Sequence, residues 1–261
     1  MPITGFLITG TDTGVGKTIS TAALAVGLQL QGVRVGIMKP AETGCPVSAG
    51  ETAPQDALFL QRIADLKAPI ELICPYRFQA PVAPLVAAEF ENSVIDQEHL
   101  TRCWQQLAAQ ADVMLVEGAG GLAVPLGENL DFAGLAALWQ LAVIVVIDNR
   151  LGCISHARLT ISYAERAGLR VAGYVVNHSS SRRDAAAASN PHTLARLLDA
   201  PCLGILPYLP ELTTHREERP QKQAAGLPEP APSTAKASLV GLARKLNLAS
   251  LGEYPARSHR K

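Results

Sequence analysis

A stretch near the start of the chain combines glycines, a lysine and a hydroxyl in an order that suits phosphate binding. The stretch, GTDTGVGKT at 10–18, follows an apolar run and precedes a segment with helical periodicity at 19–30. Glycines let the backbone N–H groups of such a loop approach successive phosphate oxygens, which a Cβ would obstruct. The Lys17 ammonium can then reach the outer phosphates, and the Thr18 hydroxyl can ligate Mg²⁺. The sequence therefore predicts a strand, a phosphate-binding loop and a helix whose positive end adds to the anion site.

The loop departs from the common spacing in one respect. Five residues separate Gly10 from Gly16 where the usual motif has four, so either the loop is longer by one or Thr11 stands in the first-glycine place. An ordinary glycine-rich turn before a helix is the alternative, and the Gly-Lys-Thr order favours phosphate binding. The residues expected to contact the nucleotide here are Gly14, Val15, Gly16, Lys17, Thr18 and Ile19.

A second lysine, Lys39, follows an apolar run at 33–38 and precedes Pro40. Proline cannot donate to a sheet ladder, so the predicted second strand stops there. Ligands of an open parallel sheet bind beyond the carboxyl ends of its strands, which would bring Lys39 into the same crevice as Lys17. A solvated lysine at a strand end is the alternative, and the small polar segment at 42–44 favours a substrate loop.

Two acidic residues are candidate oxygen ligands for Mg²⁺, together with the Thr18 hydroxyl. Asp56 stands at the head of an amphipathic segment, where it would either cap a helix or bind the metal. Glu117 closes an apolar run at 113–116 and is followed by several glycines, which let the backbone approach a ligand. A glutamate that only begins a loop is the alternative for Glu117.

Two later segments also carry candidate binding residues. A helix start at 152–156 offers N–H groups to an anion such as a substrate carboxylate, whereas His156 itself is expected to be structural or surface-exposed. Asn177 ends a predicted strand at 171–176 with a donor and an acceptor edge that suit an adenine ring, although asparagine is also an ordinary strand-ending residue.

Apolar runs alternate with helical segments over most of the chain, which predicts one α/β domain with a mainly parallel sheet and helices on both faces. Four prolines between 68 and 86 exclude a regular element through that segment. We expect this domain to span 1–210. Pro, Ala, Lys, Arg and Glu dominate beyond it, so 211–261 is expected to be a flexible low-complexity tail with one short helix at 238–248.

The composition limits the class of partner. The 261 residues carry a formal net charge of +0, which gives no electrostatic footprint for nucleic acid or an anionic membrane. Five scattered cysteines without a CxxC pair argue against a disulfide framework or a zinc site. No apolar run reaches membrane-spanning length and the N-terminus lacks a secretory signal, so we expect a cytoplasmic protein with small-molecule partners.

In their order and spacing these motifs resemble those of one family, the dethiobiotin synthetases, which are P-loop ATPases of biotin synthesis. The resemblance extends over about residues 3–209 and includes the region of Asp56. The matching segments are GTDTGVGKT at 10–18, MKPAETG at 38–44, PYRFQAPVAP at 75–84, VEGAGG at 116–121, LGCISHA at 151–157, VVN at 175–177 and LGILPYLP at 203–210.

The resemblance implies a P-loop NTPase-like fold and a reaction in which ATP, CO₂ and 7,8-diaminononanoate give dethiobiotin, ADP and phosphate. One amine takes up CO₂ as a carbamate, ATP phosphorylates the carbamate, and the neighbouring amine closes the cyclic urea. Lys39 is then the catalytic lysine. Thr18, Asp56 and Glu117 are the Mg²⁺ ligands.

Further contacts follow from the same resemblance. Thr13 and Thr43 would contact the diamine or the carbamate. The nucleotide would be lined by Gly118, Ala119, Gly120, Asn177, His178, Pro207, Tyr208 and Leu209. The family forms homodimers, so the carboxylate of a substrate held by one chain would meet residues of its neighbour, namely Gly152, Cys153, Ile154 and Ser155.

Three other functions are compatible with a phosphate-binding loop of this kind. Partition or septum-positioning ATPases usually carry an extra lysine near the start of the loop, where this chain has Thr11, Asp12 and Thr13. Amidoligases related to the cobyrinate enzymes generally append a glutaminase domain with a nucleophilic cysteine, and no cysteine follows Cys202. A nucleotide-binding module without catalysis is the third alternative.

Overall fold

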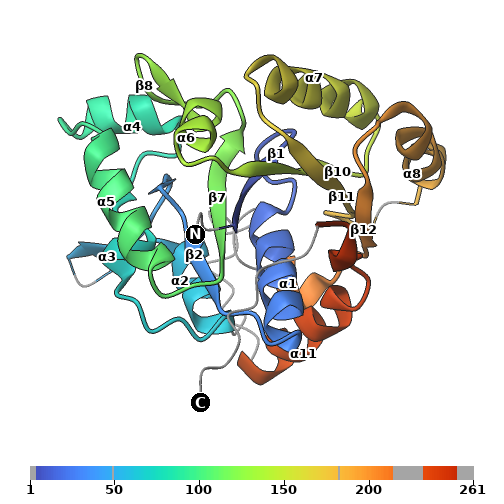
Figure 1. Cartoon of the computed structure of the whole chain (residues 1–261), viewed down its shortest axis with the longest axis horizontal. Helices are drawn as coiled ribbons and strands as arrows, with labels where there is room; N and C mark the ends of the chain where they lie inside the picture. Colours follow the sequence, from blue (N-terminus) through green and yellow to red (C-terminus); the bar gives the residue numbers. More distant parts are fainter. Residues whose placement is uncertain (1–3, 49, 182, 214–231, 252–261) are drawn as a thin grey trace.

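Six parallel strands form the central sheet of a computed structural model that describes residues 4–48, 50–181, 183–213 and 232–251 (Figure 1). Their order across the sheet is β12-β11-β10-β1-β7-β2. The strands are β1 (Thr4–Gly10), β2 (Val35–Met38), β7 (Val113–Gly121), β10 (Ala142–Asp148), β11 (Val171–Asn177) and β12 (Cys202–Leu206). All neighbours pair in parallel, so their carboxyl ends lie along one edge of the sheet. The predicted parallel α/β sheet is confirmed.

Helices cover both faces of this sheet, because alternate residues of each strand face opposite sides. In β10, Ile144 and Val146 belong to one apolar core, and Val145 and Ile147 belong to the other. The first core includes residues of α1 (Lys17–Leu30) and α2 (Gln55–Ile63). The second includes residues of α5 (Gln97–Ala108), α6 (Phe132–Leu138), α7 (Cys153–Arg166) and α8 (Ala185–Leu197). Burial on both faces explains the nearly continuous apolar runs of the strands.

Short elements connect these layers. The proline-rich segment contains α3 (Ile70–Ile73), β6 (Tyr76–Arg77) and the start of α4 (Pro84–Phe90). The prolines therefore exclude a long helix or strand through this segment, but short elements fit between them. Pro69 precedes α3 and Pro84 opens α4, a position that helices accept. The remaining short pieces are β3 (Ala41–Glu42), β4 (Val47–Ser48), β5 (Glu51–Thr52), β8 (Pro125–Gly127), β9 (Leu130–Asp131) and α9 (Pro210–Thr213).

No helix in the described ranges has both the length and the apolar character needed to cross a membrane.

Residues 232–251 of the expected tail pack on the core, and the short helix expected at 238–248 is present with different bounds. This segment forms α11 (Pro232–Ala243) and a 3₁₀ turn, η1 (Leu248–Leu251), and α11 lies beside α1 in Figure 1. Leu239 is fully buried in the same core as α1. Residues 214–231 and 252–261 of the expected tail lie outside the described residues.

Close packing joins this C-terminal segment to the phosphate-loop helix. A Cβ on Gly27 of α1 would lie only 2.8 Å from Leu248 Cδ1, so glycine provides the space for the contact. The Asn247 N–H also donates to the Leu203 carbonyl of β12 at 2.6 Å. The predicted domain boundary at residue 210 therefore separates two parts of one core.

We expect Leu239→Ala to lower the free energy of unfolding by about 2–5 kcal/mol, because truncating a fully buried leucine leaves a cavity. Leu30, at the end of α1, is 62% exposed and is the matched control. Its change to alanine should alter the free energy by only about 0.5 kcal/mol. Urea unfolding followed by circular dichroism measures both variants. Equal small changes would contradict the packing of α11 on α1.

Candidate active site

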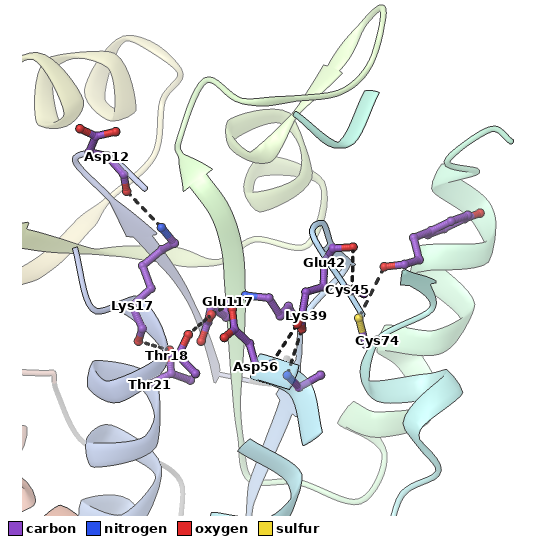
Figure 2. Close-up of polar contacts among 12 residues, drawn as sticks. Asp12, Lys17, Thr18, Thr21, Lys39, Glu42, Cys45, Asp56, Cys74 and Glu117 are labelled. Carbon is purple, nitrogen blue, oxygen red and sulfur yellow. Dashed lines mark hydrogen bonds and ion pairs between the residues drawn. The ribbon is translucent and has the colours of Figure 1, made fainter. Parts of the chain in front are cut away.

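Lys39 lies in a buried group of charged side chains at the carboxyl edge of the sheet (Figure 2). Its ammonium lies 2.5 Å from Glu117 Oε1 and 3.1 Å from Asp56 Oδ2. None of the three side chains is more than 4% exposed. Two buried carboxylates thus share one ammonium, and a further cation beside them would offset their mutual repulsion.

Glu117 and Thr18 bring two kinds of oxygen that can ligate a divalent ion close together. The Thr18 hydroxyl, in the first turn of α1, donates to Glu117 Oε1 at 2.9 Å. The other carboxylate oxygen, Glu117 Oε2, is buried and has no hydrogen-bond partner within the part of the chain that the structure describes. A buried carboxylate oxygen without a partner is costly, and an Mg²⁺ ion would satisfy it. Glu117 and Thr18 therefore offer oxygen atoms to the predicted metal, and Asp56 contacts the same lysine as Glu117.

The predicted phosphate-binding loop connects β1 to α1 and curls around the lysine side chain. The Lys17 ammonium donates to the Asp12 carbonyl at 3.1 Å. Gly14 and Gly16 adopt positive φ angles of 68° and 93°, which glycine accepts readily. A Cβ on Gly16 would also collide with Nδ2 of Asn177.

Asn177 lies behind this loop. It is 6% exposed, and its side-chain N–H donates to the Val15 carbonyl at 2.9 Å. The neighbouring His178 ring lies 3.2 Å from Asn149 Nδ2, and burial lowers the pKa of His178, with repulsion from Arg183 contributing. The structure thus gives Asn177 a contact with the loop, and its contact with adenine stays a prediction.

The glycines after Glu117 also lie against the phosphate-binding loop. Gly121 pairs with Gly10 in the sheet, and a Cβ on Gly120 would lie 3.6 Å from Thr13 Cγ2. The Thr13 side chain is exposed beside them. The backbone at the ends of β1 and β7 therefore lies next to the exposed Thr13 side chain, at the carboxyl edge of the sheet.

The start of α7 is connected to the phosphate-binding loop by an ion pair. Arg150 lies 3.0 Å from Asp12 and 3.2 Å from Asp148, measured from its guanidinium to one carboxylate oxygen of each. Gly152 and Ser155 are exposed. Cys153 is only 2% exposed, and its N–H already donates to the Arg150 carbonyl. Its side chain is therefore part of the core.

The remaining predicted site residues are half-buried. Thr43 is half-buried in the loop after β3, and Ile154 is half-buried in the first turn of α7. The three residues after β12, namely Pro207, Tyr208 and Leu209, are half-buried. The His178 N–H donates to the Leu206 carbonyl at 2.9 Å and thereby holds the ends of β11 and β12 together.

One charged residue of the site, Glu42, was not among the predicted site residues. It is 2% exposed, and its two carboxylate oxygens accept the N–H groups of Asp56 and Ala57 at 2.9 and 3.0 Å. Glu42 therefore caps α2. The interpretation of Asp56 as the helix cap is wrong, because the Asp56 side chain is directed to Lys39. The sequence signal that could have identified Glu42 as a site residue is an acidic side chain three positions after Lys39.

Glu42 is also perturbed electrostatically. Burial, with repulsion from Asp56, raises the pKa of Glu42 from 4.5 to about 7, against the attraction of Lys39 and the two N–H groups. The protonated form is thus held more tightly in the folded chain than in an unfolded one.

Comparison with known proteins identifies the family. A family model described as "AAA domain" matches residues 4–216. A relative from Thermodesulfovibrio yellowstonii is 40% identical over 216 residues, which cover 80% of this chain and 90% of that protein. One from Bacillus subtilis is 36% identical over 209 residues, covering 80% and 89%. Both are named ATP-dependent dethiobiotin synthetase BioD. This chain belongs to the dethiobiotin synthetase family.

Solved structures of other P-loop NTPases have a fold similar to that of this member of the dethiobiotin synthetase family. The MinC:MinD cell division complex of Aquifex aeolicus matches with a TM-score of 0.52 and 17% identity, covering 97% of this chain and 98% of that one. A ParA family ATPase from Chlorobium tepidum matches with a TM-score of 0.51 and 15% identity, covering 92% and 98%. At such identities the likeness shows the fold alone, and it confirms the P-loop NTPase-like prediction.

The raised pKa of Glu42 predicts a pH dependence of stability. The unfolded chain loses this proton near pH 4.5 and the folded chain near pH 7, so the contribution of Glu42 to the free energy of unfolding should fall as pH rises between these values. In Glu42→Gln this contribution is absent. Urea unfolding over this pH range should show that the difference between the two proteins changes steadily with pH. A constant difference would exclude the raised pKa.

Proposed function

We propose that this site makes dethiobiotin from 7,8-diaminononanoate, CO₂ and ATP through a carbamate and a carbamoyl phosphate. The family to which the chain belongs consists of ATP-dependent ligases, and relatives in it carry that activity in their names. The observation that carries the proposal is the buried contact of Lys39 with Glu117 and Asp56, next to the phosphate-binding loop.

The proposed reaction has three bond-forming steps. An amine nitrogen attacks the carbon of CO₂ and loses a proton, which gives a carbamate. A carbamate oxygen then attacks the γ-phosphorus of ATP, and ADP leaves. The second amine attacks the carbamoyl carbon, loses a proton and expels phosphate as the ring closes.

The difficulty of the second step is the approach of two anions, the carbamate and the triphosphate. Lys17, inside the phosphate-binding loop, and Lys39, at the edge of the same sheet, offset this repulsion with fixed positive charge. Such charge is more effective in a buried site than in water. Mg²⁺ held by Thr18, Asp56 and Glu117 would supply further charge to the phosphates.

The remaining contacts are assigned from position. Thr13 and Thr43 would hold the diamine or carbamate. The nucleotide base would lie toward Asn177, His178 and the segment 207–209.

We further propose a homodimer, in which residues 152–155 of one chain contact the carboxylate of a substrate bound by the other. Exposed apolar residues near this segment support an interface, namely Leu151, Leu159 and Tyr163. The cytoplasmic location stays a prediction.

A product assay with ATP, bicarbonate and 7,8-diaminononanoate tests the function, with each component omitted in turn. Dethiobiotin should form only when all three are present, and ADP release should depend on the diamine. ATP hydrolysis that ignores the diamine and is stimulated by DNA or lipid vesicles would instead favour a partition-type ATPase.

We expect Lys39→Ala to lower kcat by about two to three orders of magnitude, because a fixed charge that acts mainly in the transition state is lost. ATP binding, measured by calorimetry, should persist. Lys17→Ala should weaken ATP binding as well. Lys67, whose side chain is 83% exposed, is the matched control and should tolerate alanine. Near-normal turnover of a folded Lys39→Ala protein would exclude the assigned role.

A further inference from the structure

We propose that Glu42 is a positioning residue, which holds the metal ligand Asp56 in place by capping the first turn of α2. The inference rests on the proposed use of Mg²⁺ with the nucleotide. Figure 2 shows Glu42 and Asp56 on neighbouring segments, and Lys39 contacts both Asp56 and Glu117.

The first turn of α2 depends on this carboxylate. The residue at the N-cap, Pro54, has no side-chain acceptor to offer. Glu42 supplies what the cap lacks, because its Oε1 accepts the Asp56 N–H and its Oε2 accepts the Ala57 N–H. The backbone of Asp56 is therefore fixed by a residue from a different part of the chain.

Glu42 itself is held firmly. Its carbonyl accepts the Phe78 N–H at 2.8 Å and the Cys45 thiol at 3.5 Å, and β3 pairs it with Arg77 of β6. Lys39 lies just before the same short strand. One segment of chain thus carries both the catalytic lysine and the carboxylate that orients Asp56 toward it.

A substitution that keeps the shape of residue 42 tests the two hydrogen bonds that Glu42 accepts from Asp56 and Ala57. Glutamine at position 42 would keep the shape, lose the charge and offer one acceptor oxygen in place of two.

The test is the Mg²⁺ dependence of ADP binding to the full chain, measured by titration calorimetry with Mg²⁺ and with EDTA. We expect Glu42→Gln to reduce the strengthening of ADP binding by Mg²⁺ about 10- to 100-fold. ADP binding in EDTA should stay at the wild-type value, because the phosphate-binding loop is intact. An unchanged Mg²⁺ dependence in the folded variant would overturn the proposal.

Asp96 provides a matched control. Its carboxylate likewise accepts two N–H groups at a helix start, those of Glu98 and His99 at 2.9 and 3.2 Å, but it lies on the exposed start of α5. Asp96→Asn should leave the Mg²⁺ dependence of ADP binding unchanged. An equal loss in both variants would show a general effect of lost caps and would also overturn the proposal.

A double variant tests whether Glu42 acts through Asp56. In an Asp56→Asn background, Glu42→Gln should cause little further loss of Mg²⁺ dependence, whereas an additive loss would contradict the proposed route. If Glu42→Gln does not fold, Glu42→Asp keeps the carboxylate but shortens its reach to the Asp56 and Ala57 N–H groups, and it should give the same loss. A wild-type protein that binds ADP without any Mg²⁺ dependence would refute the proposed metal chemistry itself.

Discussion

The contact between Lys39 and Glu117 is the constraint on which the site depends, and it follows from the register of two strands. Met38 of β2 pairs with Val116 of β7, so the next residue of each strand lies at the same level of the sheet edge. A buried carboxylate is tolerated only with a partner, and Lys39 is that partner. A slip by one residue would bury an unpaired charge, which penalises every other register.

Much of this arrangement could be predicted from the sequence because buried parallel strands have a recognisable pattern of residues. A strand buried on both faces is a short apolar run, and the residues that follow it lie at the ligand edge. Lys39 and Glu117 each follow such a run, and Lys17 follows a glycine-rich loop with a recognisable spacing.

What could not be predicted depends on contacts between distant segments. The cap of α2 comes from Glu42, fourteen positions before Asp56, and nothing in the local sequence of α2 identifies it. The sequence predicts a short helix at 238–248, but it does not show that Leu239 and its apolar neighbours pack against α1. The burial of Cys153 likewise depends on which face of α7 meets the sheet.

The packing of α11 on α1 has a consequence for how the chain is made. The helix that carries Lys17 and Thr18 leaves the ribosome well before α11, the helix that covers it, because the two are far apart in the sequence. Until α11 has been made, the apolar side of α1 lacks that cover, and such uncovered surface promotes association between nascent chains. The helix behind the phosphate-binding loop therefore gains its full packing only when a distant segment of the chain arrives.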